Sequence, residues 1–224
     1  MERLYYEAYD DRYRQVHQEN LAWFAETPSR IVSEVIERFG VRKNDDILEL
    51  GCGEGRDAIF LLRQKYSLEA TDVSKIVIAY CRKRWPEYAD RFAVLDCVHG
   101  SLNKKYDFIY AVAVLHMFVK EEDRNGFYQF IRDHLKAGGT ALICTMGDGE
   151  LERSSDITKA FELQKRVHES SGKTLKIAST SYRAVSFDTF KKELTDNGLR
   201  ISDYGLTEIE PDYWKMMYAA VQKS

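Results

Sequence analysis

The chain has 224 residues, of which 44% are hydrophobic and 31% are charged, with a formal net charge of -3. This length and composition predict one domain over residues 1–224 that buries its core without metals or disulfide bonds. The near balance of charges argues against a nucleic acid or an anionic membrane as a partner. The four cysteines lack CxxC spacing, so we expect reduced thiols and no metal site.

The sequence contains no apolar run as long as the roughly 18 residues that a membrane-spanning helix needs. Its first residues, Met1 to Tyr6, lack the apolar run of a secretory signal peptide. We therefore expect a cytoplasmic protein that works without a membrane. No apolar pattern specifies an oligomer, so a monomer and a homodimer both remain open.

The first half of the chain alternates between strand-like and helix-like segments. Residues 1–26 carry Tyr5, Tyr9 and Tyr13, whose spacing places them on one face of a helix, and residues 31–39 predict a second helix. The segments that follow are strands at 47–50, 68–71, 92–95, 108–114 and 140–146, with helices at 58–62, 76–80 and 127–135. Such alternation predicts an α/β fold in which helices cover both faces of a doubly wound, mostly parallel sheet.

The alternation breaks after Met146. Residues 147–186 form a polar insertion, with a helical pattern of Ala160, Leu163 and Val167 and a strand-like piece at 174–185. The remaining predicted elements are a helix at 187–197 and strands at 200–209 and 213–221. Only three residues link the last two strands, which predicts antiparallel pairing because a parallel crossover needs about a dozen residues.

The main chemical signal is the segment Glu49-Leu50-Gly51-Cys52-Gly53-Glu54-Gly55, which joins a buried strand to a helix. Glycines there let the backbone turn tightly and approach a ligand. Asp72 ends the next strand, 17 residues after Gly55 (72 − 55 = 17), where its carboxylate can accept hydrogen bonds from ribose hydroxyls. Asp96 repeats this geometry one strand further out and could bind an adenine amino group. The alternative role for Asp72 is a helix cap or a turn residue, and for Asp96 it is a turn residue.

These residues resemble motif I of the class I S-adenosylmethionine-dependent methyltransferases. The resemblance continues through Tyr106–Tyr110, His116 and Leu135–Gly139, so that it covers residues 44–146 in order. It implies a Rossmann-like, seven-stranded sheet of order 3-2-1-4-5-7-6 whose last strand is antiparallel, with an N-terminal helix over residues 1–26 as a lid. Within the family, the tellurite-resistance and thiopurine-type small-molecule enzymes look most similar.

The resemblance implies S-adenosylmethionine as the cofactor and S-adenosylhomocysteine as its product. The loop is G-x-G-x-G, unlike the G-x-G-x-x-G of dinucleotide sites. A tyrosine face suits a sulfonium cation, although helix packing would also explain the tyrosine stripe. The cofactor-binding residues that we predict are Tyr13, Glu49, Gly51, Cys52, Gly53, Gly55, Asp57, Asp72, Val73, Asp96, Cys97, Val98 and Ala111.

The predicted reaction is methyl transfer to an oxygen, nitrogen or sulfur atom of a small molecule. Its candidate catalytic residues are His116, as a general base, and Asp148. The alternative role for His116 is packing under the cofactor, and the alternative for Asp148 is a place in a solvated loop. Tyr9, His116, Glu150 and Arg183 are the candidate substrate-binding residues, with Asp148 and Glu150 expected to orient a cationic acceptor.

The end of the fourth predicted strand argues against one class of acceptor. The chain has Ala111-Val112-Ala113-Val114 where some relatives carry N/D-P-P-Y, which argues against DNA adenine or glutamine methylation. Three other functions stay open. They are a non-catalytic protein that binds an adenosyl ligand on the same fold, an enzyme of this fold that runs different adenosyl chemistry or uses a nicotinamide cofactor, and a methyltransferase that acts on a protein or peptide.

Overall fold

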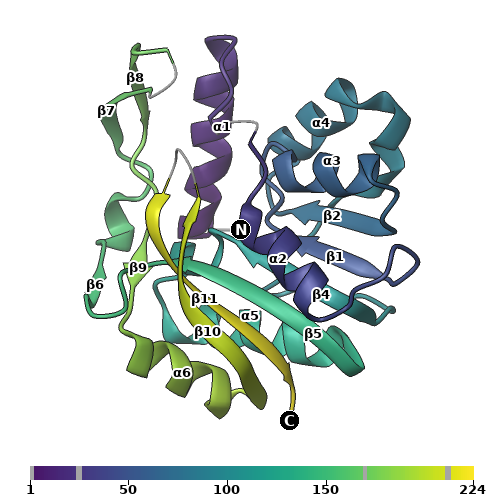
Figure 1. Cartoon of the computed structure of the whole chain (residues 1–224). Coiled ribbons are helices and arrows are strands. Elements are labelled where there is room, and N and C mark those ends of the chain that lie inside the picture. Colours follow the sequence, from purple (N-terminus) through teal and green to yellow (C-terminus); the bar gives the residue numbers. More distant parts are fainter. Residues whose placement is uncertain (1–2, 24–26, 169–170, 210–212) are drawn as a thin grey trace.

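The computed structural model describes residues 3–23, 27–168, 171–209 and 213–224. At its centre lies a seven-stranded sheet of order β3-β2-β1-β4-β5-β11-β10 (Figure 1). Neighbouring strands are parallel from β3 to β5, and β11 is antiparallel to both β5 and β10. The strands are β1 (Ile47–Leu50), β2 (Leu68–Asp72), β3 (Phe92–Val94), β4 (Tyr106–Val112), β5 (Leu135–Met146), β10 (Leu199–Ile209) and β11 (Tyr213–Lys223). This confirms the predicted order and the reversed last strand, although the link between β10 and β11 lies outside the described residues.

Helices cover both faces of the sheet, as Figure 1 shows. They are α1 (Ala8–Gln18), α2 (Arg30–Arg38), α3 (Arg56–Arg63), α4 (Lys75–Arg84), α5 (Glu121–His134) and α6 (Phe187–Asp196), with short 3-10 turns at η1 (Tyr5–Glu7), η2 (Pro86–Arg91), η3 (Leu115–Met117) and η4 (Ile157–Lys159). Helices α2, α3 and α4 share one apolar cluster, and α5 and α6 share another. Within the described ranges, no helix combines the length and the apolar character needed to cross a bilayer.

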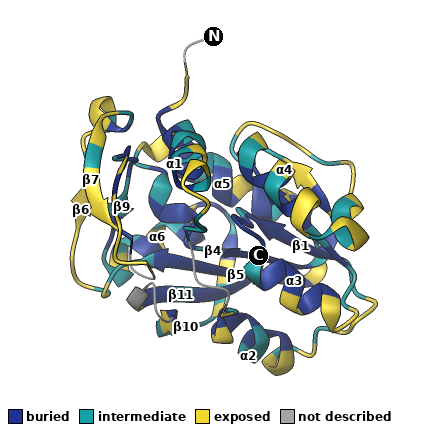
Figure 2. Cartoon of the chain, turned by 90° about the horizontal axis from the view of Figure 1, so that it is seen from above, coloured by how far each residue is buried: buried dark blue, intermediate teal, exposed yellow. Residues whose placement is uncertain are grey.

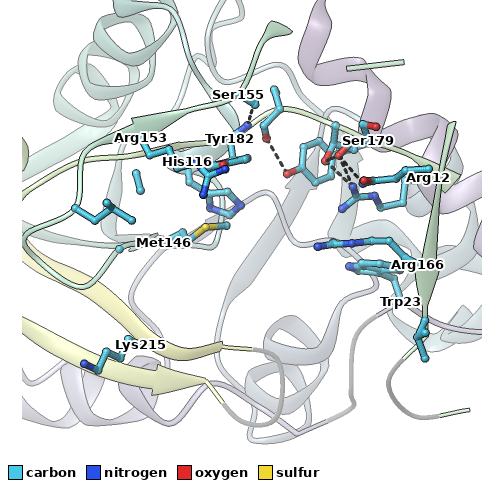
Figure 3. A pocket seen from close by; sticks show the side chains of 18 of the residues that line it. Arg12, Trp23, His116, Met146, Arg153, Ser155, Arg166, Ser179, Tyr182 and Lys215 are labelled. Atoms are coloured by element: carbon cyan, nitrogen blue, oxygen red, sulfur yellow. Dashed lines mark hydrogen bonds between the residues drawn. The ribbon is translucent and has the colours of Figure 1, made fainter. Parts of the chain in front are cut away.

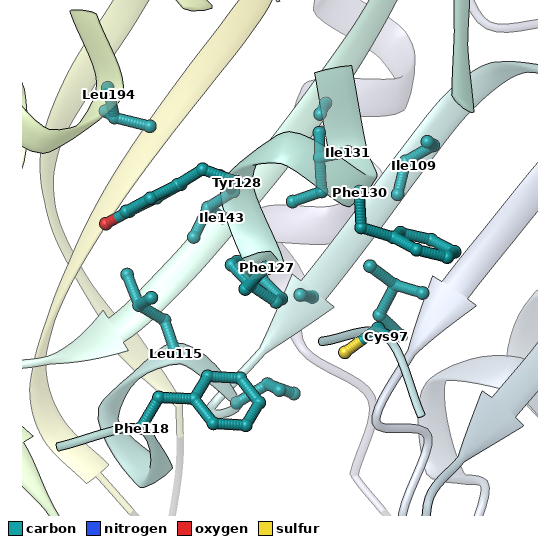
Figure 4. Close-up of a cluster of buried hydrophobic side chains, with 14 of the residues drawn as sticks. Cys97, Ile109, Leu115, Phe118, Phe127, Tyr128, Phe130, Ile131, Ile143 and Leu194 are labelled. Atoms are coloured by element: carbon teal, nitrogen blue, oxygen red, sulfur yellow. The ribbon is translucent and has the colours of Figure 1, made fainter. Parts of the chain in front are cut away.

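Strand β4 separates these two clusters. Ile109 and Ala111 belong to the cluster with α5 and α6, whereas Phe108 and Tyr110 belong to the cluster on the opposite face. Figure 4 shows Phe127 of α5 in the first cluster. Because β4 is buried on both faces, residues 108–112 of this strand form a continuous apolar run without polar alternation.

The parallel strands end together at one edge of the sheet. Strands β1, β2 and β4 end at Leu50, Asp72 and Val112, and parallel strands share the edge at which they end. Helix α3 begins directly after the glycine loop, and Ser74 caps α4 because its Oγ accepts a hydrogen bond from the backbone N–H of Val77 (3.1 Å). Loops that follow β1, β2 and β4 therefore meet where open α/β sheets bind ligands.

The insertion over residues 147–186 contains two small antiparallel sheets in place of the predicted helix, and the strand-like piece at 174–185 holds a strand of each. These sheets pair β6 (Arg153–Ser154) with β9 (Arg183–Ala184), and β7 (Leu163–Val167) with β8 (Thr174–Ala178). The helix predicted from Ala160, Leu163 and Val167 is wrong: β7 is an extended edge strand, largely exposed in Figure 2. Apolar burial in this hairpin comes from β8, whose Leu175 and Ile177 pack with Val16 of α1. Tertiary pairing therefore overrode a weak helical period.

The N-terminal helix is shorter than the segment 1–26 predicted for it. Tyr5 lies in η1, before α1, and its hydroxyl donates a hydrogen bond to Asp123 Oδ2 of α5 (2.6 Å). Arg12 of α1 donates hydrogen bonds to the carbonyl oxygens of Ala178 (2.9 Å) and Ser179 (2.7 Å). Helix α1 therefore connects the ligand-binding edge of the sheet to the insertion.

Candidate functional site

The glycine loop between β1 and α3 holds a backbone conformation that favours glycine. Gly51 and Gly53 have φ angles of +69° and +51°. A Cβ on Gly51 would collide with Val114, and one on Gly53 would lie 2.9 Å from the Tyr13 hydroxyl oxygen. Gly55 also has a positive φ, of +80°, but the atoms around it belong to the protein core. The loop therefore leaves no room for a Cβ at Gly51, where Val114 packs, and Gly55 packs against the core.

Asp72 at the end of β2 holds the glycine loop in place. Its carboxylate oxygens accept hydrogen bonds from the backbone N–H groups of Gly53 (2.9 Å) and Ser74 (2.9 Å). Burial raises the pKa of the Asp72 carboxyl from 3.8 to about 6, against the opposing effect of these two hydrogen bonds. Asp72 is therefore an anchor for the loop and a carboxylate that lines a cavity.

Glu49 and Asp57 flank the loop on its buried side. Glu49 Oε2 is buried and has no hydrogen-bond partner among the described residues, and burial together with the Asp57 charge raises the pKa of Glu49 well above 4.5. Asp57 instead accepts hydrogen bonds from the backbone N–H (2.6 Å) and the hydroxyl (2.8 Å) of Ser29, the residue before α2. Glu49 is thus the carboxylate with hydrogen-bonding capacity left for a ligand.

Asp96 follows β3 and meets the N-terminal segment. It accepts hydrogen bonds from the backbone N–H of Val98 (2.8 Å) and from the hydroxyl of Tyr6 (3.1 Å). The Tyr6 hydroxyl is also 3.0 Å from His99 Nδ1. Burial, followed by the charge of Asp96, raises the pKa of Tyr6 far above its usual value of 10.0, so Tyr6 stays a neutral donor.

These groups surround a small cavity, here called the inner cavity, of about 70 Å³. The predicted cofactor residues that line it are Tyr13, Glu49, Gly51, Gly53, Asp57, Asp72, Val73, Asp96 and Cys97, together with Tyr9 from the predicted substrate set. Four predicted residues do not line it, because Cys52, Gly55, Val98 and Ala111 point into the core or into neighbouring backbone.

The inner cavity also has walls outside the set of cofactor-binding residues that we predicted. They are Tyr6, Arg56, Thr71, Leu95, Val112, Ala113, Val114, Met117 and Phe118. Ala113 has a φ of +59°, which turns the chain at the end of β4 and sets its neighbours at the wall. The tyrosine-rich N-terminus was a signal for Tyr6, but only Tyr5, Tyr9 and Tyr13 fit the helical spacing that we used.

A larger cavity of about 1020 Å³, here called the outer cavity, lies under the insertion (Figure 3). Of the predicted catalytic and substrate residues, Tyr9, His116 and Asp148 line it. Asp148 is exposed and accepts hydrogen bonds from the backbone N–H groups of Glu150 (3.0 Å) and Leu151 (2.9 Å), which lower the pKa of its carboxyl. The Asp148 carboxylate is therefore largely used within its own loop.

Glu150 and Arg183 lie outside the wall of the outer cavity. Glu150 is exposed, while Arg183 donates a hydrogen bond to the carbonyl oxygen of Val119 (3.2 Å) and lies 3.6 Å from Glu193 Oε1. Arg183 therefore ties β9 to α6 and to the segment after η3.

His116 lies in η3, directly after β4, and is 1% exposed. Burial, then the charges of Arg12 and Arg124, lowers the pKa of its imidazole from 6.5 to about 3. The imidazole is therefore neutral at neutral pH. Arg124 of α5 donates hydrogen bonds to the carbonyl oxygens of Leu115 (3.2 Å) and Phe118 (3.3 Å), which fixes the turn that carries His116.

The walls of the two cavities meet at one turn. Met117 lines the inner cavity, His116 lines the outer cavity, and Tyr9 lines both. Among the residues with described placement, no group of three or more His, Cys, Asp or Glu side chains is arranged to hold a metal ion. The geometry provides one polar, glycine-lined cavity beside a second, larger one.

The chain is similar to known proteins in both sequence and structure. Malonyl-[acyl-carrier protein] O-methyltransferase of Acetivibrio thermocellus is 33% identical over 104 residues, which are 46% of this chain and 36% of that protein. The probable S-adenosyl-L-methionine-dependent methyltransferase TehB of Haemophilus influenzae is 26% identical over 115 residues, 50% of this chain and 40% of that protein. The matches thus span well under half the length of these curated relatives.

A similar solved structure is the 1,6-didemethyltoxoflavin-N1-methyltransferase of Burkholderia thailandensis. It has a TM-score of 0.69 at 15% identity, over 94% of this chain and 84% of that one, and so shares the fold. The family model described as tellurite resistance protein TehB matches residues 17–168, which is more than half of the chain. This chain therefore belongs to the TehB family, which confirms the resemblance seen in its sequence.

Proposed function

We propose that the protein is an S-adenosylmethionine-dependent methyltransferase that acts on an oxygen, nitrogen or sulfur atom of a small molecule. The observation that carries this proposal is the pair of cavities that share Tyr9 in their walls and to which the turn Leu115–Met117 contributes His116 and Met117, respectively. A cofactor in the inner cavity and an acceptor in the outer cavity would meet at this turn. Methyl transfer needs such an in-line approach of two bound molecules.

The residues of the inner cavity fit S-adenosylmethionine. Asp72 and Asp96 can accept hydrogen bonds from the ribose hydroxyls and the adenine amino group, respectively. The buried Glu49 Oε2 suits the amino group of the methionine portion, and Gly51 and Gly53 leave room for close backbone approach. When bound, this cofactor supplies a methyl group that its sulfonium has already activated.

The N-terminal segment is proposed to act as a lid over this cofactor. The inner cavity of about 70 Å³ is smaller than the roughly 300–1,000 Å³ typical of ligand pockets. Tyr6, Tyr9 and Tyr13 cover it, and Tyr6 already donates a hydrogen bond to Asp96. Entry of the cofactor therefore requires this segment, within residues 1–26, to move. Residues 147–186 would cover the bound acceptor. Both segments would belong to a single domain over residues 1–224.

The chain's own residues would mainly orient the acceptor and exclude water. His116 is neutral, so it can accept a hydrogen bond from an acceptor O–H or N–H group. Its pKa of about 3 makes it a weak base, and we assign it a role in alignment more than in proton removal. The small-molecule acceptor is supported by the Burkholderia relative, whose structure holds 1,6-didemethyltoxoflavin with S-adenosylhomocysteine.

The test is calorimetric titration of the purified protein with S-adenosylhomocysteine. We expect a Kd in the micromolar range, and at least a tenfold weaker Kd, about 1.4 kcal/mol, for Asp72→Ala. Asp156→Ala is the matched control, because Asp156 caps the exposed turn η4 and lines neither cavity. Absence of binding by folded wild-type protein would contradict the proposal. Binding without methyl transfer to any of a set of amines, thiols and phenols would favour a non-catalytic adenosyl-binding protein.

A further inference from the structure

Strand β7 of the insertion borders the outer cavity with its edge and not with one of its faces. The consecutive residues 164–168 all line this cavity, although successive side chains of a strand point to opposite faces. Of the neighbouring strand β8, which is described in full, no residue lines the cavity. The outer cavity therefore runs along the side of β7 that faces away from β8.

The hydrogen bonds of this hairpin show which backbone groups of β7 point toward the cavity. The backbone N–H of Ser179 donates to the carbonyl oxygen of Glu162 (2.8 Å), and that of His168 donates to the carbonyl oxygen of Lys173 (2.8 Å). Both bonds join directly opposite residues when the register of β7 and β8 is continued by one position. In an antiparallel pair, such hydrogen-bonded positions alternate with positions whose N–H and C=O groups point outward. The outward positions of β7 are therefore Leu163, Lys165 and Val167.

Lys165 and Val167 thus present a short row of backbone groups to the outer cavity. Both residues line it, and within the described ranges β7 is paired with β8 alone. No hydrogen bond joins the outward N–H or C=O of either residue to another described residue. The two positions are about 7 Å apart, because each residue of a strand rises by about 3.4 Å. Their N–H and C=O groups therefore have the spacing with which an extended peptide presents its own.

The remaining wall and the size of the outer cavity suit the same kind of ligand. Two further runs of consecutive residues, 146–148 and 179–182, line the cavity, so main chain forms a large part of its surface. Its volume of about 1020 Å³ lies at the upper end of the range for sites that bind organic ligands. A chain of a few amide-linked residues fills such a space, whereas a small amine, thiol or inorganic ion leaves most of it open.

We propose that the acceptor is a short peptide or peptide-like chain that binds in the outer cavity as an added strand on the edge of β7. This proposal rests on the proposed function, because it takes the outer cavity as the acceptor site. The extended chain pairs with the backbone groups of Lys165 and Val167, whose alternating partial charges complement those of an amide chain. One side chain of the peptide extends toward His116 and Tyr9, where the walls of the two cavities meet.

The test follows the solvent exchange of individual backbone amides by NMR in protein saturated with S-adenosylhomocysteine. The probe is a mixture of acetylated tetrapeptide amides of random sequence, because main-chain pairing provides affinity for any sequence. At about ten times its Kd the peptide occupies about nine tenths of the sites, so exchange at Lys165 and Val167 should slow about tenfold. The Leu163 amide also points outward but Leu163 does not line the outer cavity, so its exchange rate should change less than about twofold.

A matched pair of proline variants tests the edge of β7 itself. Val167→Pro removes an N–H that points into the outer cavity, and Leu163→Pro removes an outward N–H beyond that cavity. Neither change removes a hydrogen bond between β7 and β8, and proline is tolerated at edge positions whose N–H is not paired. The slowing at Lys165 should fall to about twofold or less in Val167→Pro and stay as in wild type in Leu163→Pro. S-adenosylhomocysteine binding should be unchanged in both variants, because β7 does not line the inner cavity.

Several results would overturn the proposal. One is no slowing at about 20 mM peptide, which fills most sites even at a Kd of about 1 mM. Others are equal slowing at Leu163, or equal slowing by tetrapeptides with N-methylated backbone amides. Mass spectrometry of the peptides after incubation with S-adenosylmethionine should show methyl transfer, and its absence would contradict the acceptor role. If S-adenosylhomocysteine itself does not bind, the exchange measured without it decides separately: slowing at Lys165 and Val167 would support the peptide site while the methyltransferase function fails.

Discussion

Acidification should weaken cofactor binding through Asp72. Burial raises the pKa of this carboxyl to about 6, whereas an exposed aspartate titrates near 3.8. A ribose hydroxyl that donates a hydrogen bond favours the ionised carboxylate, so the cofactor binds the ionised form. The opposite sign holds for folding. Since the pKa is raised in the folded state, ionisation of Asp72 lowers the stability of the cofactor-free protein as pH rises from about 4 to 6.

The size of the binding effect follows from that pKa. If only the ionised form binds, the apparent Kd increases by the factor 1 + 10^(6 − pH), which is about 1.1 at pH 7 and about 11 at pH 5. The loss between these two values of pH is therefore about tenfold, or about 1.4 kcal/mol. Glu49 also lines the inner cavity with a raised pKa, so a variant is needed to isolate the contribution of Asp72.

The assay is calorimetric titration with S-adenosylhomocysteine at pH 5, 6 and 7. Wild type should lose about tenfold in affinity over this range, with net release of protons on binding at pH 5 to 6. Asp72→Asn should bind more weakly at pH 7 but lose much less affinity on acidification. Asp156→Asn should behave as wild type. An unchanged pH dependence in Asp72→Asn would refute the assignment and point to Glu49.

Two further predictions concern the turn that carries His116. Arg124 is buried and pairs with Glu193, which also contacts Arg183 (3.6 Å) and the Tyr128 hydroxyl (2.8 Å). Arg124→Met removes the cation nearest to that carboxylate and the donor to the turn, and it should lower the free energy of unfolding by about 1–3 kcal/mol in urea titration; a loss below about 1 kcal/mol would contradict this. Because burial lowers the pKa of His116 to about 3, its unfolded form takes up a proton first, and stability is lost as pH falls below 6.5. Between pH 7 and 5 wild type should therefore lose about 2 kcal/mol more than His116→Gln, and equal losses would argue against the shift.

The sequence determined the central sheet. The parallel strands contain short apolar stretches, and the run over residues 108–112 has no polar alternation because both of its faces are covered. The alternation of such runs with amphipathic helices specifies a parallel sheet and its crossovers. Gly51, Gly53 and Asp72 were also readable, because strand ends in this topology meet at one edge and the glycine spacing lies within a single loop.

The insertion could not be predicted in the same way. Leu163 and Val167 fit a helical period, but they lie exposed on an edge strand, and the apolar contacts of the hairpin come from Leu175 and Ile177. Those contacts exist only because α1 packs against β8. A short polar segment has too few apolar residues for its pattern to predict its secondary structure. Its conformation therefore depends on the element that it packs against, here α1.

The chemistry of the two cavities was decided by tertiary structure. Tyr6 reaches Asp96 across 90 residues of sequence, and no local spacing encodes such a contact. Likewise the described residues that line the outer cavity come from α1, β6, β7 and β11 and from the loops between them, so segments far apart in the sequence build one site. Composition averages over the whole chain, whereas a ligand responds only to the side chains that folding brings within a few ångströms of it.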